Sequence, residues 1–129
     1  MTNVIWKSQN VSNQTVKRYR IVESIGWQVQ VQPHAWSPPT DVYQVDDTYI
    51  VRVEIAGMHH QDFSIQIEDN YLIISGIRRD RTERRAYHQM EVRYGEFSTI
   101  VPIPGPINLE GVNAEYDDGL LSVILPKAK

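Results

Sequence analysis

The chain has 129 residues, enough for one domain with an arm but too few for two ordinary domains. Its net charge of −3 disfavours nucleic acid as the main partner, because phosphate binding needs excess cationic charge. The absence of cysteine excludes disulfides and thiolate metal sites. No apolar run reaches membrane-spanning length and the N-terminus has no signal-peptide core, so we expect a cytoplasmic protein without a membrane partner.

Consecutive prolines at Pro38 and Pro39 divide the chain, because such a pair neither continues a helix nor donates to a sheet. We therefore expect an N-terminal arm over residues 1–38, a domain over residues 39–127 and a short tail at residues 128–129.

The arm contains all three tryptophans of the chain. Residues 27–32 alternate with period two, which predicts a strand. Residues 15–25 are of mixed character and are compatible with a helix. We therefore expect the arm to be flexible or partly helical.

Beyond the prolines the pattern is one of short strands and tight turns. Residues 49–55 alternate apolar and polar side chains, as a half-buried strand does. The pair Asp118-Gly119 tolerates the positive φ angles of a two-residue hairpin turn. With no convincing helix in the domain, the pattern predicts an all-β, antiparallel, immunoglobulin-like sandwich. The expected strands are residues 41–45, 49–55, 63–68, 71–77, 95–103, 112–116 and 120–125.

The segment over residues 78–94 is polar, rich in arginine and longer than an ordinary hairpin loop. Residues 87–92 within it are compatible with a short strand whose unpaired amides favour pairing with another molecule. The arginines are compatible with a patch for nucleic acid or anionic lipid. We favour a solvated loop, because no aromatic residue interleaves the basic run as a stacking platform requires.

Catalytic chemistry is not expected. The four histidines, His34, His59, His60 and His88, form no second cluster that completes a metal site. The chain has no phosphate-binding loop, no cysteine nucleophile and no serine elbow. We therefore expect no enzyme activity, no cofactor and no metal.

Residues 41–127 resemble the α-crystallin domain of small heat shock proteins, of the bacterial and plant type with a strand-exchange loop. The most specific match is a family pattern of alanine, glycine and leucine, which here falls on Ala114, Gly119 and Leu121. The other matching pieces, in order, are residues 41–43, 49–57, 67–78, 87–88 and 91–97.

Three departures from the family pattern stand out. Ala56 occupies a position that is usually proline, and Thr99 one that is commonly arginine. The chain also ends at Lys129 without the isoleucine-x-isoleucine or valine anchor that ties dimers of relatives together. The missing anchor argues against a large cage built by self-assembly alone. The expected building block is a homodimer, formed by strand exchange, and a higher oligomer stays open.

The resemblance also implies which residues carry the interactions. Reciprocal strand exchange between two chains is assigned to Asp41, Val42, Tyr43, Tyr87, His88, Gln89, Met90 and Val92. A groove for anchors or clients is assigned to Ile65, Ile67, Val112 and Ala114. The alternative is that these side chains fill the core. In the arm, an apolar set either captures clients, packs between protomers or folds back on its own domain: Ile5, Trp6, Ile25, Trp27 and Trp36.

The function that the resemblance implies is an ATP-independent holdase, a chaperone that binds non-native client proteins and prevents their aggregation. Two alternatives remain open. A co-chaperone or adaptor with a related sandwich would bind one folded partner, although such proteins usually lack the long exchange loop. A structural subunit of a mixed small heat shock protein assembly would accept an anchor from a relative in its groove.

Overall fold

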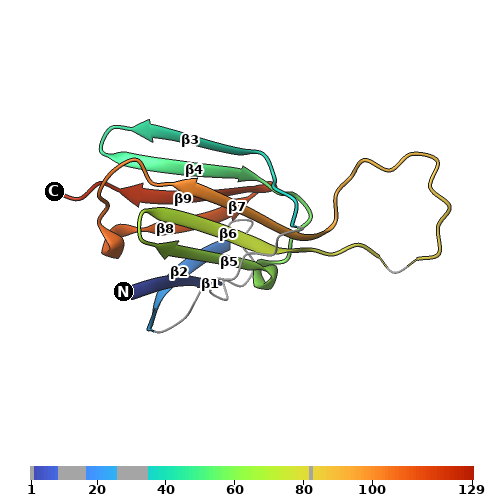
Figure 1. Cartoon of the computed structure of the whole chain (residues 1–129), viewed down its shortest axis with the longest axis horizontal. Coiled ribbons are helices and arrows are strands. Elements are labelled where there is room, and N and C mark those ends of the chain that lie inside the picture. The colour runs from blue at the N-terminus through green and yellow to red at the C-terminus, as the bar shows by residue number, and fades with distance from the viewer. Residues whose placement is uncertain (1, 9–16, 26–34, 82) are drawn as a thin grey trace.

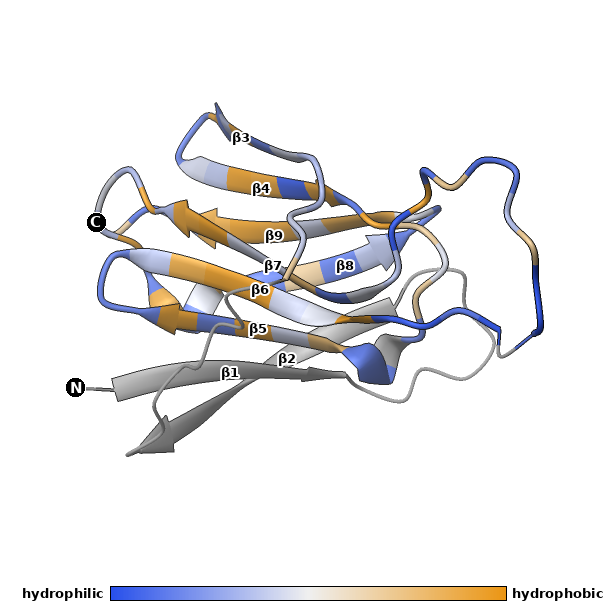
Figure 2. Cartoon of the chain, turned by 45° about the vertical axis from the view of Figure 1, so that its right-hand side comes forward, coloured by the Kyte–Doolittle hydropathy of each residue, from blue (hydrophilic) through white to orange (hydrophobic). Residues whose placement is uncertain are grey.

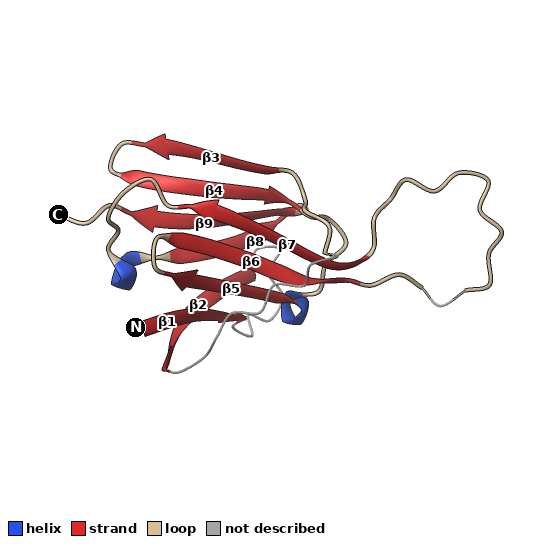
Figure 3. Ribbon diagram, in the orientation of Figure 1, coloured by secondary structure: helices blue, strands red, loops and turns tan. Residues whose placement is uncertain are grey.

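The computed structural model describes residues 2–8, 17–25, 35–81 and 83–129. Strands dominate these residues, with two single turns of 3₁₀ helix (Figures 1 and 3). The elements are β1 (Thr2–Ser8), β2 (Lys17–Ile25), β3 (Thr40–Val45), β4 (Thr48–Glu54), η1 (His60–Asp62), β5 (Phe63–Glu68), β6 (Tyr71–Arg78), β7 (Gly95–Pro102), η2 (Leu109–Gly111), β8 (Asn113–Asp117) and β9 (Leu120–Pro126).

The domain is a sandwich of two antiparallel layers. One layer has the order β3-β4-β9-β8 and the other has the order β5-β6-β7. The hairpin of β2 and β1 lies between β8 and β5, so that all the strands form one sheet with the order β3-β4-β9-β8-β2-β1-β5-β6-β7. The predicted antiparallel sandwich is thus confirmed, with each predicted domain strand within one or two residues of its observed position.

The arm differs from its prediction in one described part. Residues compatible with a helix form strand β2, which pairs with β1 over residues 19–25 and with β8 over residues 17–19. Tyr19, Ile21, Val22 and Ile25 are aromatic or β-branched, and such residues suit a strand that pairs with β1. The predicted strand at residues 27–32 lies outside the described residues.

The core lies between the two layers and follows the predicted alternation. On β4, Val51 and Val53 are fully buried, whereas Arg52 between them is exposed. Figure 2 shows the same pattern as hydrophobic stretches along β4, β9 and β6. The largest fully buried side chains are Phe97, Ile55, Ile65, Leu72, Ile74, Leu121, Leu125, Val51, Val53 and Val123.

Aspartates occupy the left-handed position in three hairpin turns. Asp46, Asp69 and Asp118 have φ angles of 52°, 56° and 50°. Gly119 follows with a φ of 80°, and its carbonyl accepts a hydrogen bond of 2.9 Å from the Ile55 amide. The predicted Asp-Gly turn is therefore confirmed, and it also fixes the end of β4. No helix in the described ranges has the length and hydrophobicity to cross a membrane.

Candidate interaction edges

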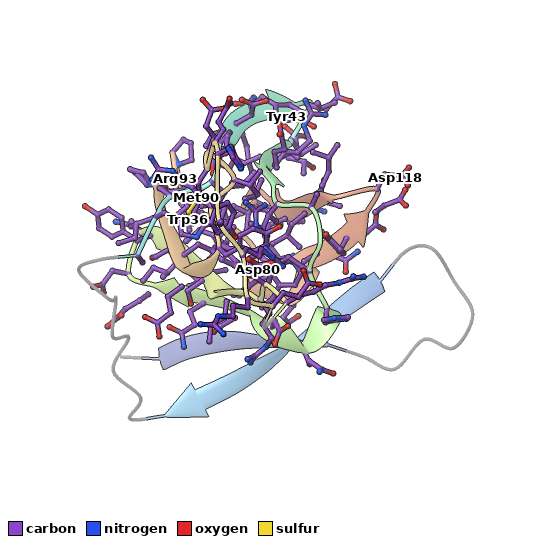
Figure 4. All side chains as sticks on the ribbon, turned by 90° about the vertical axis from the view of Figure 1, so that its right-hand side faces the viewer. Trp36, Tyr43, Asp80, Met90, Arg93 and Asp118 are labelled. Atoms are coloured by element: carbon purple, nitrogen blue, oxygen red, sulfur yellow. The ribbon has the colours of Figure 1, made fainter. Side chains whose placement is uncertain are left out.

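Strand β3 presents a partly apolar outer edge. It is the last strand in the sheet order, and β4 is its neighbour on the inner side. Its side chains Val42, Tyr43 and Val45 are 43%, 37% and 50% exposed. Figure 4 shows Tyr43 at the rim of the molecule on this strand. An edge strand offers every second amide and carbonyl group to a partner strand, so β3 is a template for pairing.

The segment between β6 and β7 projects well away from the sandwich (Figure 1). Its return limb carries Tyr87, Met90 and Val92, which are 51%, 64% and 60% exposed. The short strand predicted at residues 87–92 does not form in the single chain. The physical reason is that this limb has no neighbouring strand to satisfy its backbone groups.

Arg78 clamps the base of this projecting loop. Its guanidinium donates to the Arg93 carbonyl, through Nε at 2.8 Å, and to the Ala56 carbonyl at 3.4 Å. The same group lies 4.6 Å from the ring centre of Trp36 and 5.5 Å from that of Tyr94. One cation therefore joins the outgoing limb, the returning limb and the domain. Sequence analysis missed this role, because no local pattern around Arg78 indicates these partners.

A second charged cluster closes the outer part of the loop. Arg85 donates to both carboxylate oxygens of Asp80, at 2.9 and 3.2 Å, and also to Glu83 and Tyr87. Burial raises the pKa of Asp80, but the hydrogen bonds from Arg85 and the Arg81 amide outweigh it and lower the pKa below its ordinary value. The hydrogen bond to Asp80 in turn raises the pKa of Arg85.

Several arginines of the basic run are paired within the chain. Besides the Arg85 pairs, Arg79 lies 3.3 Å from Asp62 and Arg81 lies 3.7 Å from Glu83. These carboxylates neutralise part of the positive charge that binding of a nucleic acid would require. The pairing supports a solvated loop over a nucleic-acid patch.

The border of the sandwich beside β7 is partly closed by residues 36–40. Trp36 forms a parallel bridge with Phe97, and its ring packs 5.7 Å from that of Phe97. The Thr40 and Thr99 hydroxyls lie 3.2 Å apart, which ties the start of β3 to β7. Thr99 is thus a buried residue whose hydroxyl has a hydroxyl partner.

The other border, between β5 and β8, is where we predicted a groove. All four predicted groove residues, Ile65, Ile67, Val112 and Ala114, are buried and belong to the core. The strands beside them are occupied, since β1 pairs with β5 and β2 pairs with β8. The four residues thus fill the core, which was the alternative to a groove, and the arm folds back on its own domain, which was one of the alternatives for the arm.

The arm residues proposed for client binding take three different positions. Ile5 and Trp6 lie on β1 and Ile25 ends β2, while Trp27 lies outside the described residues. Trp36 packs on the domain instead of projecting from it. Where the structure describes side chains, no three His, Asp or Glu residues gather into a metal site.

The family assignment follows from comparison with known proteins. The model of the Hsp20/alpha crystallin family matches residues 41–129. The chain belongs to this family. Members of the family are non-enzymatic chaperones.

Relatives in bacteria, fungi and plants align with the same part of the chain. Small heat shock protein C2 of Rickettsia felis is 33% identical over 92 residues, which are 70% of this chain and 60% of that protein. Heat shock protein 16 of Schizosaccharomyces pombe is 33% identical over 101 residues, 75% of this chain and 71% of that protein. The 17.7 kDa class II heat shock protein of Arabidopsis thaliana is 36% identical over 69% of this chain and 60% of that protein. The chain thus spans less than two thirds of the first and third of these relatives.

Solved structures show the same fold. Heat shock protein 16.0 from Schizosaccharomyces pombe superposes with a TM-score of 0.65 at 31% identity, covering 75% of this chain and 71% of that one. HSP18.5 from E. histolytica gives a TM-score of 0.66 at 28% identity, covering 74% of this chain and 91% of that one.

Proposed function

We propose that this small heat shock protein is an ATP-independent holdase of the cytoplasm whose building block is a homodimer. As a chaperone of this kind it binds non-native client proteins and prevents their aggregation. Higher oligomers would be built from the dimer. We further propose that residues 39–127 form the dimerising domain and residues 1–38 the arm that regulates or extends binding.

The proposed dimer rests on one observation: two segments of the chain have backbone groups without a strand partner, and each could supply the partner of the other. The outer edge of β3 and the limb at residues 87–92 both expose apolar side chains and backbone groups. In one chain they belong to different parts of the molecule, whereas two chains related by a two-fold axis would pair each limb with the other's β3. Each pairing gives hydrogen-bond partners to backbone amides that are exposed to solvent in the single chain. The two-fold axis creates two identical contacts of this kind.

Deleting residues 81–90 should therefore convert dimers to monomers in sedimentation equilibrium, while circular dichroism retains the β signal of the domain. A point variant tests the other half of the contact. Tyr43→Lys places a charge on the β3 edge and should weaken the dimer. Tyr71→Lys is the matched control, because Tyr71 is 48% exposed but lies on β6. A dimer that persists in the deletion variant rules out strand exchange.

Holdase activity is tested by light scattering from a heated model client without ATP. We expect substoichiometric to stoichiometric amounts of the protein to suppress the scattering. A protein that leaves the scattering of several unrelated clients unchanged, but binds one folded protein tightly, would be an adaptor instead.

A further inference from the structure

The two segments assigned to the dimer contact have opposite net charges. The loop over residues 78–94 contains six arginines and three carboxylates, which give it a net charge of +3 with histidine neutral. Strand β3 and its turn, residues 40–48, contain three aspartates and no arginine or lysine, a net charge of −3. The whole chain has a net charge of −3, so the loop is a positive segment on an otherwise negative chain.

In both segments the charges flank an apolar centre. Asp41 lies before the exposed apolar side chains of β3 and Asp47 lies after them. Arg84 lies before the limb at residues 87–92 and Arg93 lies after it. All four charged side chains belong to exposed residues. Because each segment has charges of one sign at both ends, opposite charges meet whether the limb pairs with the partner's β3 in a parallel or an antiparallel direction.

Most of these flanking charges have no ion pair within their own chain. Among the described residues, no charged side chain pairs with Asp47, Arg84 or Arg93. Asp41 lies 3.7 Å from Arg52, and their side chains are 71% and 43% exposed, so this pair is long and weak. The charges at both ends of each segment can therefore interact with another chain.

The spacing of the charges fits a paired strand. At about 3.3 Å per residue, Asp41 to Asp47 spans about 20 Å and Arg84 to Arg93 spans about 30 Å when the limb is extended. With the two segments centred, each arginine lies about 5 Å beyond an aspartate, an offset that its long side chain can cover. A slip of two residues keeps every side chain on its face but moves one arginine about 7 Å further away. The charges therefore favour one register.

We propose that these flanking charges select the partner in strand exchange. The partner that fits is a second copy of this chain, because it offers a carboxylate-flanked β3 to an arginine-flanked limb in both contacts of the dimer. A chain with the sign of either segment reversed is rejected, since like charges then meet at the ends of the paired strands. This inference rests on the proposed homodimer, and it adds that the choice of partner is electrostatic.

Two charge-reversed variants test the selection. The edge variant, Asp41→Lys with Asp47→Lys, changes the charge of residues 40–48 from −3 to +1. The loop variant, Arg84→Glu with Arg93→Glu, changes the charge of residues 78–94 from +3 to −1. In a homodimer of either variant, both contacts join segments of like charge. In the mixed dimer of the two variants, both contacts join segments of opposite charge.

Sedimentation equilibrium in 0.1 M NaCl should give each variant alone a dimer dissociation constant at least about tenfold above that of the natural chain. The equimolar mixture should return to within about threefold of the natural value, with the mixed dimer as the main species in native mass spectrometry. In 1 M NaCl, where the Debye length is about 3 Å, these differences should vanish. Glu54→Lys with Glu110→Lys is the control, because it makes the same charge change at exposed positions outside both segments.

Variants that dimerise as tightly as the natural chain in 0.1 M NaCl overturn the proposal. It is also overturned by a mixture that does not recover, because the substitutions then act through folding or packing, which circular dichroism of each variant reveals. The natural chain gives an independent measurement, since its dissociation constant should rise at least about threefold from 0.1 to 1 M NaCl. Deleting residues 81–90 separates this result from the proposed function: a dimer that survives the deletion removes the strand-exchange contact itself, whereas monomers after the deletion with unaffected charge variants remove only the charge selection.

Discussion

Replacing Arg78 by methionine removes the guanidinium that clamps the loop base while keeping a side chain of similar length. The lost contacts are two ring contacts, with Trp36 and Tyr94, and two carbonyl acceptors, Arg93 and Ala56. Ring contacts of this kind contribute about 0.5–1 kcal/mol each when exposed. Hydrogen bonds contribute about 0.5–1.5 kcal/mol each. Because Arg78 is half-buried, we take a value near the lower end, about 2 kcal/mol for each clamp.

The lost stabilisation of the loop should weaken the dimer. Without the Arg78 contacts the loop is less ordered in the single chain, so dimer formation must also supply the free energy of ordering it. About 2 kcal/mol corresponds to roughly a 30-fold rise in the dissociation constant for each clamp. Because a symmetric dimer contains two clamps, the expected rise is on the order of 1000-fold. Sedimentation equilibrium over a concentration series measures it. Arg79→Met is the matched control, since the Arg79 side chain is 63% exposed and pairs with Asp62 instead. If Arg78→Met and Arg79→Met both stay within threefold of the natural chain, the clamp does not position the loop.

Two further predictions concern single positions. Gly76→Ala should destabilise the fold by about 1–3 kcal/mol, because the new Cβ would overlap the Asp62 carbonyl oxygen and lie 2.8 Å from the Phe97 ring. Chemical denaturation measures the loss, with Ser75→Ala as the control. An unchanged unfolding midpoint contradicts this packing. The Asp80 carboxyl should titrate below its ordinary 3.8 in carbon-13 NMR, and Arg85→Gln should raise that midpoint. Because folding lowers the pKa of Asp80, its ionised carboxylate stabilises the ordered loop fully at pH values above 3.8. This stabilisation is lost as the pH falls through the lowered pKa. A titration midpoint of Asp80 at or above 3.8 refutes the pairing with Arg85.

Local chemistry made the sandwich predictable. The alternation from Tyr49 to Ile55 and the Asp118-Gly119 turn depend on neighbouring residues, and both the strand and the turn were placed from these residues alone. The groove assigned between β5 and β8 came from the family resemblance, and it stays a prediction.

Long-range partners were not predictable in the same way. Nothing in the sequence around Ile5 or Arg18 indicates that these residues pair with Gln66 and Glu115. By sequence alone, residues 15–25 are also compatible with a helix, because strand formation there depends on neighbouring strands that are distant in the sequence. The Thr40–Thr99 contact likewise joins residues far apart in sequence. Such contacts depend on how the layers close, which a local pattern does not encode.

The position of the hairpin in the sheet also has a consequence for biosynthesis. The hairpin is made before the domain, but one of the two strands that it pairs with is β8, which ends at residue 117. A ribosome that adds about 5–20 residues per second therefore holds the hairpin away from this partner for several seconds. During that interval the nascent arm must avoid pairing with other chains, and the polar residues Lys17, Arg18 and Arg20 on β2 are suited to that task.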